Sequence, residues 1–432
     1  MTQINNKSRL TLSVFYVILI ILKGIREMEK TILHCDLNNF YASVECTQNP
    51  ILWSKPVAVT GNPRTRHGII LAKNEVAKAT GVKTAQTIWE AKKLCPNLIC
   101  LPPQFELYQQ FSRKVRSIYQ RFTDKVESFG PDECWLDVTH SQKLFGTGEQ
   151  IANTLRKIVK EETGLTISVG VSFNKTFAKL GSDLKKPDAT TVISKENFKE
   201  KIWHLPASDL IFIGKKTYQK LNKLNIYTIK DLAYADEKLL QQQFGILGPH
   251  YKKVALGLDD SEVTHQNFLD KAKSVGNGMT AIRDLRTREE IEAMVHTLAE
   301  KVTFRMREAG LVGRTATLSL RNSELHTTSH SFTSTKSTDD PIIFAQMCMQ
   351  LFDNFWHNTP LSIRSVRISM SNLDYAGNAQ QMDLFDAKAI EKKKKLNRSL
   401  DAIRQKYGFY AVRRAKTIDR DFINYFEVDE ED

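Results

Sequence analysis

The alternation of hydrophobic and polar positions first singles out a segment near residue 35. The mostly apolar run 32–35 is bounded by polar residues, which predicts a short buried strand. Asp36 follows this run and is expected at the carboxyl end of the strand. Asn38 or Asn39 is suited to cap a helix that begins at Phe40. The pattern thus predicts a strand that carries one carboxylate to its end.

A second segment supplies two further acids at a predicted turn. Strand-like runs at 126–129 and 134–138 flank a Gly-Pro pair, which is typical of tight turns. Asp132 and Glu133 follow this pair, so both are expected at a strand tip. An acid at a strand end is usually solvated, and for a single acid that interpretation is preferred. Three carboxylates from two segments, in contrast, can hold two hard cations through oxygen ligands, as phosphoryl transfer from a triphosphate requires.

The remaining pattern predicts strands and helices along most of the chain. An amphipathic helix is expected at 105–122, where the apolar positions indicate packing into a core. Asn174 is suited to cap a helix that follows a strand at 165–171. The other predicted elements are strands at 56–60, 68–72, 315–321 and 363–370 and helices at 74–80, 289–309, 342–356 and 387–407.

Composition narrows the class of protein. The 432 residues are 41% hydrophobic, enough for several cores, and the length suggests about two to four domains. Lys and Arg number 62 against 49 Asp and Glu, and the net charge of +13 favours a polyanionic partner. The cysteines form no Cys-x-x-Cys pair, which indicates a reduced, cytoplasmic protein without a zinc site or disulfides. They are Cys35, Cys46, Cys95, Cys100, Cys134 and Cys348.

The apolar N-terminal extension, residues 1–27, permits two interpretations. Its apolar run at 10–22 follows basic residues, as in a signal peptide or membrane anchor, yet thirteen residues are too few for a helix to span a bilayer easily. No small-residue cleavage site follows the run. We therefore expect no membrane association and favour the hypothesis that Met28 is the natural initiator, so that the extension is not native.

Four motifs in a fixed order carry a resemblance to a known family. They are Cys-Asp-Leu-Asn-Asn-Phe-Tyr-Ala-Ser-Val-Glu at 35–45, Asp-Glu-Cys-Trp-Leu-Asp-Val-Thr at 132–139, Val-Gly-Val-Ser-Phe-Asn-Lys-Thr-Phe-Ala-Lys at 169–179 and Lys-Pro at 186–187. Together they resemble the Y-family translesion DNA polymerases of the UmuC/DinB, or ImpB/MucB/SamB, type. The resemblance covers roughly residues 29–373, and an ordered set of this kind is more specific than any one motif.

The resemblance implies an α+β multidomain fold. A ferredoxin-like palm would carry the acids, together with small fingers, a helical thumb with a helix-hairpin-helix and an α/β little-finger domain. The implied boundaries are 1–27 for the extension, 28–46 and 104–195 for the palm, 47–103 for the fingers, 196–260 for the thumb, 261–278 for a linker, 279–375 for the little finger and 376–432 for a tail.

By the same resemblance the protein is an error-prone, template-directed DNA polymerase that adds dNTPs to a primer. The catalytic acids would be Asp36, Asp132 and Glu133. With the backbone carbonyl of Leu37 they would hold two Mg²⁺ ions per active site. No second set of acids suggests a proofreading nuclease.

The resemblance also assigns residues to nucleotide binding. Phe40 and Tyr41 would lie beneath the sugar, with Tyr41 as the steric gate against a 2′-hydroxyl. Lys78 and Lys186 would contact the triphosphate, because a lysine acts as a flexible point charge. Glu75 stands where the family has an aromatic residue, so the contact made by that residue differs in this chain.

Later segments are implied to contact primer-template DNA. Gly214 and Lys215 would present a helix N-terminus to phosphates, although Phe212 replaces a family glycine. Arg321 and Arg367 lie at or near strand ends, where they would follow the phosphate backbone.

The tail carries a motif that resembles the bacterial sliding-clamp-binding pentapeptide. Its contact residues would be Gln381, Met382, Leu384 and Phe385. The motif follows the little finger, where the family keeps it. A sliding clamp is therefore an expected partner.

Two alternative functions remain at the level of the sequence. Asn38 occupies a position at which the UmuC branch has Asn, so the protein could be active only with accessory partners such as a UmuD-like protein. The second alternative is a catalytically silent DNA- or clamp-binding factor with the same fold. The intact set of three acids disfavours this second alternative.

Overall fold

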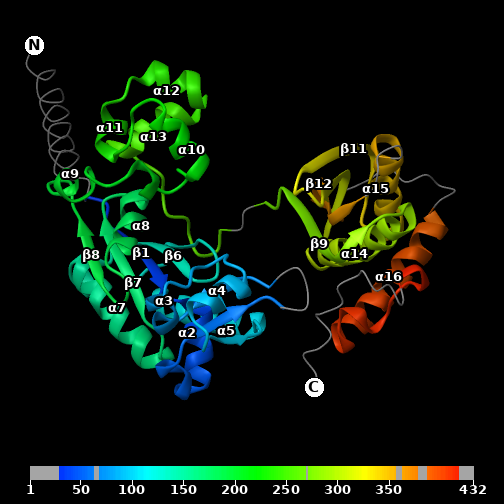
Figure 1. Ribbon diagram of the computed structural model, residues 1–432, viewed down its shortest axis with the longest axis horizontal. Helices are drawn as coiled ribbons and strands as arrows, with labels where there is room; N and C mark the ends of the chain where they lie inside the picture. Colours follow the sequence, from blue (N-terminus) through cyan, green and yellow to red (C-terminus); the bar gives the residue numbers. More distant parts are fainter. Residues whose placement is uncertain (1–28, 63–67, 269–270, 357–361, 378–386, 418–432) are drawn as a thin grey trace, which may run out of the picture. The chain divides into compact units, whose positions relative to one another are not determined.

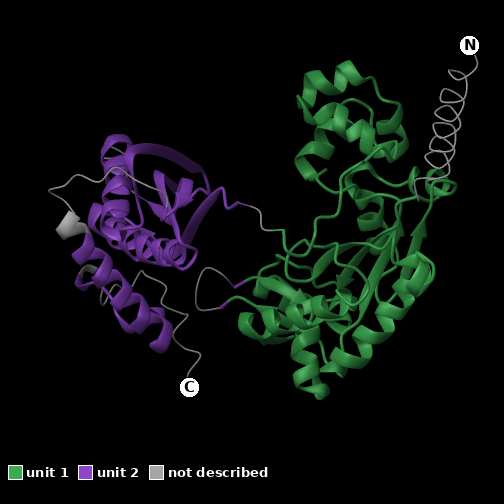
Figure 2. Ribbon diagram, turned by 180° about the vertical axis from the view of Figure 1, so that it is seen from behind, with its two compact units in different colours: residues 1–61, 69–268 green, residues 62–68, 269–432 purple. Residues whose placement is uncertain are grey.

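The computed structural model describes residues 29–62, 68–268, 271–356, 362–377 and 387–417. Contacts divide the chain into two compact units, residues 1–61 with 69–268 and residues 62–68 with 269–432 (Figure 2). The N-terminal extension and the clamp-binding motif lie outside the described residues. Both units combine helices with a sheet, which confirms the expected α+β multidomain class.

The first unit contains a five-stranded sheet in the order β5-β6-β1-β7-β8 (Figure 1). Its strands are β1 (Ile32–Leu37), β5 (Val126–Ser128), β6 (Glu133–Asp137), β7 (Ile167–Ser172) and β8 (Thr190–Ile193). The central strand β1 pairs antiparallel with β6 and β7 and is buried along its whole length. The strand predicted at 32–35 is therefore confirmed and extends further, so that Asp36 lies inside the sheet.

Alternation along β1 directs its side chains to two faces that different helices cover. The surrounding helices are α2 (Phe40–Gln48), α5 (Phe105–Tyr119), α6 (Gln142–Phe145), α7 (Gly148–Thr163) and α8 (Lys175–Leu184). Leu33 and Cys35 enter a large apolar core with residues of α5 and α7. Ile32 instead packs against Ala178 of α8. By the same alternation Asp36 belongs to the α8 face of the sheet.

Two residues fix the position of α8. Asn174 caps the helix, since its Oδ1 accepts a hydrogen bond of 2.7 Å from the Phe177 amide, as the sequence predicted. Gly170 of β7 faces the helix, and a Cβ there would lie 1.9 Å from the Ala178 carbonyl oxygen. Only glycine therefore allows the helix to lie this close to the strand.

The side-chain cap predicted for α2 is wrong. Asn39 precedes the helix with a φ of 52° and makes no capping hydrogen bond. Its amide donates instead to Glu75 Oε1 at 2.8 Å. The buried Asn38 donates to Thr166 Oγ1 at 3.1 Å and accepts from Ser168 Oγ at 2.8 Å. Both asparagines make tertiary contacts, which compete with the local cap.

A three-stranded sheet with its own apolar core follows α2 in the first unit. Its elements are η1 (Pro50–Ser54), β2 (Val57–Thr60), β3 (Ile70–Lys73), α3 (Glu75–Ala79), α4 (Ile88–Leu94) and β4 (Ile99–Leu101). Strands β2 and β3 pair antiparallel, whereas β2 and β4 pair parallel. The predicted strands at 56–60 and 68–72 and the helix at 74–80 are confirmed within two residues at each end.

Helices alone form the last part of the first unit, around a separate core. They are α9 (Phe198–Ile202), η2 (Ala207–Asp209), α10 (Lys215–Asn222), α11 (Ile229–Tyr234), α12 (Glu237–Phe244) and α13 (Leu247–Ala255). Thr228 caps α11 in a reciprocal capping box with Asp231.

The second unit contains a four-stranded antiparallel sheet in the order β11-β10-β12-β9. Its elements are β9 (Ser274–Leu285), α14 (Arg288–Glu308), β10 (Leu311–Asn322), β11 (Thr327–Thr338), α15 (Pro341–Phe355) and β12 (Ile363–Tyr375). Helices α14 and α15 share one apolar core with alternate residues of β9, β10 and β12. The two helices therefore cover one face of the sheet.

Strands β9 and β11 were not expected from the sequence. Because β9 begins at Ser274, residues 274–278 are strand, and the predicted linker 261–278 is too long at its C-terminal end. Strand β11 is almost entirely Ser, Thr and other polar residues and lies at the sheet edge. Strand β11 shows no apolar alternation, and in β9 the polar residues Asn277 and Arg283 interrupt the apolar positions.

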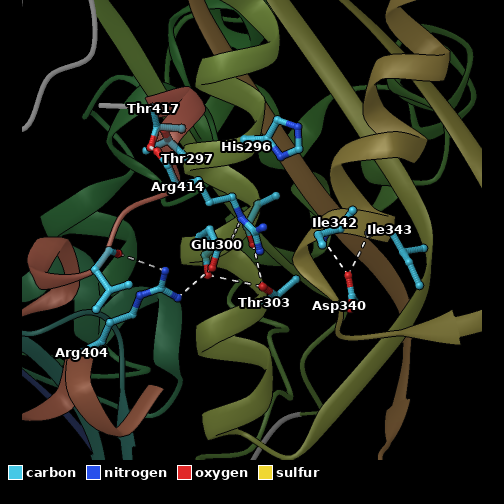
Figure 3. A network of polar contacts seen from close by, with 12 residues as sticks. His296, Thr297, Glu300, Thr303, Asp340, Ile342, Ile343, Arg404, Arg414 and Thr417 are labelled. Atoms are coloured by element: carbon cyan, nitrogen blue, oxygen red, sulfur yellow. Dashed lines mark hydrogen bonds and ion pairs between the residues drawn. The ribbon is translucent and has the colours of Figure 1, made fainter. Parts of the chain in front are cut away.

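The tail helix α16 (Ala387–Tyr407) packs against α14 through ion pairs, as Figure 3 shows for its second half. Arg404 Nη1 lies 2.8 Å from Glu300 Oε2, and the Arg414 guanidinium contacts the other oxygen of the same carboxylate. Arg307 Nε lies 2.6 Å from Asp401 Oδ2. The helix predicted at 387–407 is confirmed, and its docking was not foreseen. No helix in the described ranges is both long and apolar enough to cross a membrane.

Candidate active site

A cleft of about 360 Å³ opens in the first unit where β1 ends. Its lining consists of Asp36, Leu37, Asn39, Phe40, Tyr41, Leu71, Ala72, Lys73, Thr84, Pro131, Asp132, Glu133 and Lys186. The three predicted catalytic acids therefore share one cleft with Leu37, with the predicted sugar-binding aromatics and with Lys186. Lys78, which the sequence also assigned to nucleotide binding, is absent from this lining.

Strand pairing brings the acids of the two segments together. Asp36 and Glu133 are directly opposite each other in the β1–β6 register. The Leu37 amide donates to the Asp132 carbonyl at 3.1 Å, which holds Asp132 beside the end of β1. Even so, no three His, Cys, Asp or Glu side chains in the described part of the chain are arranged to hold a metal ion.

Two lysines stand against the acids. Lys179 Nζ of α8 lies 3.2 Å from Asp36 Oδ2 and 2.6 Å from Glu133 Oε2. Lys186 Nζ lies 2.8 Å from the same Asp36 oxygen. Asp183 is a fourth acid, 3.5 Å from Lys179 and 2.9 Å from Lys186. The sequence assigned a role to Lys186 but missed Lys179 and Asp183, although a spacing of four residues on a helix places two side chains on one face.

The carboxylates differ in charge state because their surroundings differ. Burial alone would raise the pKa of Glu133, but the close contacts with His34 and Lys179 hold that pKa low, at about 2. Burial and the charges of Asp36 and Glu133 raise the pKa of Asp132 to about 6. Burial would lower the pKa of Lys179, but Asp36 and Glu133 reverse the effect and raise it. Lys179 is therefore a firmly held cation, whereas no lysine in the described ranges forms an ion pair with Asp132.

His34 supports Glu133 from within the sheet. The fully buried imidazole lies two residues before Asp36 on the same strand face, with Nε2 3.1 Å from Glu133 Oε2. Its Nδ1 lies 2.8 Å from Ser182 Oγ of α8. Burial lowers the pKa of His34, so the ring is neutral near pH 7 beside the Glu133 carboxylate. His34 and Asp36 are two residues apart on one strand and therefore share a face. The sequence analysis did not use this spacing to find His34.

An aromatic pair forms one wall of the cleft. The Tyr41 ring stacks on the Tyr108 ring, with centroids 4.3 Å apart and planes inclined by 14°. Tyr108 donates from its hydroxyl to Glu45 Oε1 at 2.5 Å, and both residues are buried. The helical periodicity of α5 assigned Tyr108 to the core, which is correct but incomplete, because the same ring also supports Tyr41.

Glu75 pairs with Lys78 at the edge of the small sheet. Lys78 Nζ lies 3.4 Å from Glu75 Oε1, and both side chains are about half exposed. Glu75 stands where the family has an aromatic residue. Its negative charge thus offsets the positive charge of Lys78. Lys73 lines the cleft itself, with Nζ donating to Thr84 at 3.2 Å, and the sequence analysis missed it.

The predicted DNA contacts of the first unit lie at the start of α10. Gly214 is the N-cap residue, and Lys215 is the first residue of the helix; both are exposed. Phe212 has a φ of 70° and a side chain that is 70% exposed. This left-handed conformation favours glycine, which explains why the family pattern has glycine here.

The predicted DNA contacts of the second unit lie on the sheet face opposite α14 and α15. Arg367 is directly opposite Ser319 and Gly278 in the register, and Arg321 is opposite Ser365. On this open face, hydroxyl groups of β10 form hydrogen bonds with hydroxyl groups of β11. The pairs are Thr315 with Thr333 at 2.9 Å, Thr317 with Ser331 at 2.8 Å and Ser319 with Ser329 at 2.7 Å. Arg321 and Arg367 are exposed and bring positive charge to this polar face.

Comparison with known proteins assigns the family. A model described as "impB/mucB/samB family" matches residues 35–183, and one described as "impB/mucB/samB family C-terminal domain" matches residues 272–384. A solved Y-family DNA polymerase chimera superposes with a TM-score of 0.71 at 22% identity, covering 80% of this chain and 99% of that one. The chain belongs to the impB/mucB/samB family and is a Y-family DNA polymerase of the DinB type.

Curated relatives narrow the class further. The chain is 45% identical over 388 residues to DNA polymerase IV of Acetivibrio thermocellus, a match that covers 90% of this chain and 97% of the relative. It is 34% identical over 396 residues to DNA polymerase IV 1 of Bacillus subtilis, covering 91% and 94%. The protein is therefore a DNA-directed DNA polymerase of translesion synthesis and DNA repair, it binds primer-template DNA, and its family uses a divalent metal ion.

Proposed function

We propose that the protein adds dNTPs to a primer 3′ end by two-metal phosphoryl transfer, with Asp36, Asp132 and Glu133 as the metal ligands. The observation that carries this proposal is the convergence of these acids, from two distant segments, on one cleft. The Leu37 carbonyl would complete the set. Because the sequence offers no separate acids for a proofreading nuclease, we expect error-prone synthesis.

The donor set fits hard divalent cations. Carboxylate and carbonyl oxygens are the ligands that Mg²⁺ prefers, and two ammonium groups already stand against the acids. When bound, two Mg²⁺ ions would lower the barrier to deprotonation of the primer 3′-hydroxyl and neutralise charge on the β- and γ-phosphates. Asp36 is suited to hold both ions, because it lies at the centre of the sheet, between the second acid segment and α8.

The other lining residues have roles in binding the nucleotide. Phe40 and Tyr41 would lie under the sugar, and the Tyr41 ring would exclude a 2′-hydroxyl by its volume. Lys186 would leave Asp36 for the triphosphate. Lys78 is a second candidate for the triphosphate, although its pairing with Glu75 weakens the case. Asn38 is bound through its amide to Thr166 and Ser168, so it is not available as a ligand.

The polymerase domain names follow from the same proposal. The five-stranded sheet and its helices would be the ferredoxin-like palm, the three-stranded sheet the fingers, and α9 to α13 the thumb. The second unit would be the little finger. Gly214 and Lys215 would direct the N-terminus of α10 at duplex phosphates, and the open face with Arg321 and Arg367 would contact the DNA backbone.

Partners other than DNA are also part of the proposal. Gln381, Met382, Leu384 and Phe385 would bind a bacterial sliding clamp. A UmuD-like accessory protein belongs to the UmuC alternative, and relatives named DNA polymerase IV favour the DinB type instead. We therefore expect extension activity without an accessory subunit.

Primer extension tests the proposal. The purified protein alone, with Mg²⁺, dNTPs and a primed template, should extend the primer, and EDTA should stop the reaction. Extension that appears only after an accessory protein is added would favour the UmuC alternative. No extension under any condition, with DNA binding intact, would favour the silent binding factor.

A further inference from the structure

Lys179 contacts two of the three acids that we propose as metal ligands. Its ammonium is within 3.2 Å of oxygens from Asp36 and Glu133, the two acids that face each other across the β1–β6 pairing. A Mg²⁺ ion bound to the same oxygens would need distances of about 2.0–2.1 Å. The ammonium and the metal ion cannot both make these contacts, since they would occupy the same space and repel each other.

We infer that Lys179 is the resident cation of the metal-free site. It holds Asp36 and Glu133 together until a divalent cation displaces it, and Asp183 then retains it. The inference rests on the proposed metal site and adds that Lys179 competes with the divalent cation for the same carboxylates. It also explains why the acids share a cleft and yet are not arranged as a ready metal cluster in the described residues.

Asp183 is placed to receive the displaced lysine. It lies one helical turn after Lys179 on α8, with its Oδ2 3.5 Å from the Lys179 ammonium. Its Oδ1 lies 2.9 Å from Lys186, the other lysine that pairs with Asp36. Asp183 is 45% exposed, whereas Asp36 is 7% exposed, so a lysine held by Asp183 alone stands further out of the cleft. Asp183 is thus a positioning residue for both lysines.

The resident cation has a consequence for DNA binding. Without lysines, three carboxylates would face the phosphates of an approaching primer end. Lys179 and Lys186 offset two of these charges, and among the described residues no lysine pairs with Asp132. The metal-free protein can therefore accept primer-template DNA before a divalent cation arrives.

Metal binding without DNA or nucleotide tests the inference directly. Mn²⁺ affinity, measured by the loss of the free-ion electron paramagnetic resonance signal, should rise about tenfold or more in Lys179→Met. Lys179→Arg keeps a cation at the acids and should bind Mn²⁺ as weakly as wild type. Asp183→Asn removes the alternative partner of Lys179 and should bind Mn²⁺ more weakly than wild type. A purely structural lysine would instead make all three variants weaker.

Lys175→Met is the matched control. Lys175 lies one turn earlier on α8, is 14% exposed like Lys179, and pairs with Glu127 at 2.5 Å instead of with the catalytic acids. Its loss changes the net charge equally and should change Mn²⁺ affinity by less than twofold. If circular dichroism finds Lys179→Met unfolded, Lys179→Gln provides the same comparison, because its amide can still donate to Asp36.

The outcomes separate this inference from the proposed function. Wild-type binding of Mn²⁺ that is lost in Asp36→Ala, with no gain in Lys179→Met or Lys179→Gln, overturns the inference and leaves the metal site intact. Absence of Mn²⁺ binding in wild type and in every variant overturns the metal site itself. In EDTA, primer-template affinity should fall severalfold in Lys179→Met and remain unchanged in Lys179→Arg, and equal affinity in both would also overturn the inference.

Discussion

The rings of Tyr41 and Tyr108 stack at a centroid distance of 4.3 Å. The two residues come from α2 and α5, which are separated in sequence by the whole three-stranded sheet. Tyr108 is itself held by the Glu45 carboxylate, and burial followed by this hydrogen bond raises its hydroxyl pKa well above the ordinary value. The Tyr41 ring therefore rests on a rigid support, as a group that excludes a substituent by volume requires.

Tyr41→Ala should admit ribonucleotides. Removal of the ring opens the space that a 2′-hydroxyl would fill, and the preference for dATP over ATP should fall by about 10-fold or more. Single-nucleotide incorporation of each triphosphate measures the ratio. Tyr41→Phe keeps the ring and should keep the preference. An unchanged ratio in Tyr41→Ala would remove Tyr41 from the gate.

Alanine at any one of the three acids should abolish nucleotide addition. Asp36→Ala, Asp132→Ala and Glu133→Ala should each lower the extension rate by about 10³-fold or more, because metal ions supply several kcal/mol of transition-state stabilisation. Primer-template affinity, measured by fluorescence anisotropy, should remain nearly intact, since these acids do not attract phosphate. Substantial extension by any of the three variants would contradict the assignment.

Asp132→Asn should stabilise the metal-free protein, and only above about pH 6. The pKa of Asp132 is raised to about 6 by burial and by its acidic neighbours. A carboxyl whose pKa is raised on folding contributes stability below its unfolded pKa of about 3.9, and this contribution is lost as the pH rises through about 6. In EDTA, the variant should melt above wild type at pH 7.5 and equally near pH 4. The same difference at both pH values would argue against this ionisation.

Phe212→Gly should relieve backbone strain and favour DNA binding. The left-handed φ of 70° costs a non-glycine residue about 1–2 kcal/mol, and the largely exposed ring offers little burial in return. We expect the free energy of unfolding to rise by about 0.5–1 kcal/mol, because relief of the strain exceeds the entropic cost of glycine, and primer-template affinity to increase. Phe212→Ala, which removes the ring but keeps the strain, should show no such gain in stability in urea titrations.

Loss of the two apolar anchors in the tail should remove stimulation by a sliding clamp. A well-buried anchor contributes roughly 2–4 kcal/mol in an interface. A polymerase held by the clamp stays near the primer end at a high effective concentration. Even a modest contact therefore raises synthesis greatly. Leu384→Ala combined with Phe385→Ala should leave extension on a bare primer unchanged. If the clamp still stimulates this variant, the contact lies elsewhere in the protein.

The sequence was informative where buried apolar patterns and turn residues coincide. The strand that bears Asp36, the turn before Asp132 and the cap at Asn174 are all present as predicted. Each depends on local interactions, because a strand period, a Gly-Pro turn and a capping side chain involve neighbouring residues only. These local features place the three acids at two strand ends, and the pairing of β1 with β6 brings those ends to one cleft.

Features that depend on tertiary contacts were not predictable in the same way. Asn38 and Asn39 fit the composition of a helix cap, but partners far away in the sequence use both side chains. Strand β11 lacks apolar alternation because polar residues occupy nearly every position on both of its sides. The docking of α16 depends on charged pairs such as Arg404 with Glu300, which no periodicity encodes.

The hydroxyl pairs of the open face in the second unit bear on how a polymerase advances. Thr317 with Ser331 and Ser319 with Ser329 repeat one motif along β10 and β11, and the partners already satisfy each other. If this face contacts DNA as we propose, a duplex would meet similar hydroxyl pairs at successive positions. Translocation by one nucleotide would then exchange equivalent interactions, so that this face would offer the duplex no preferred register.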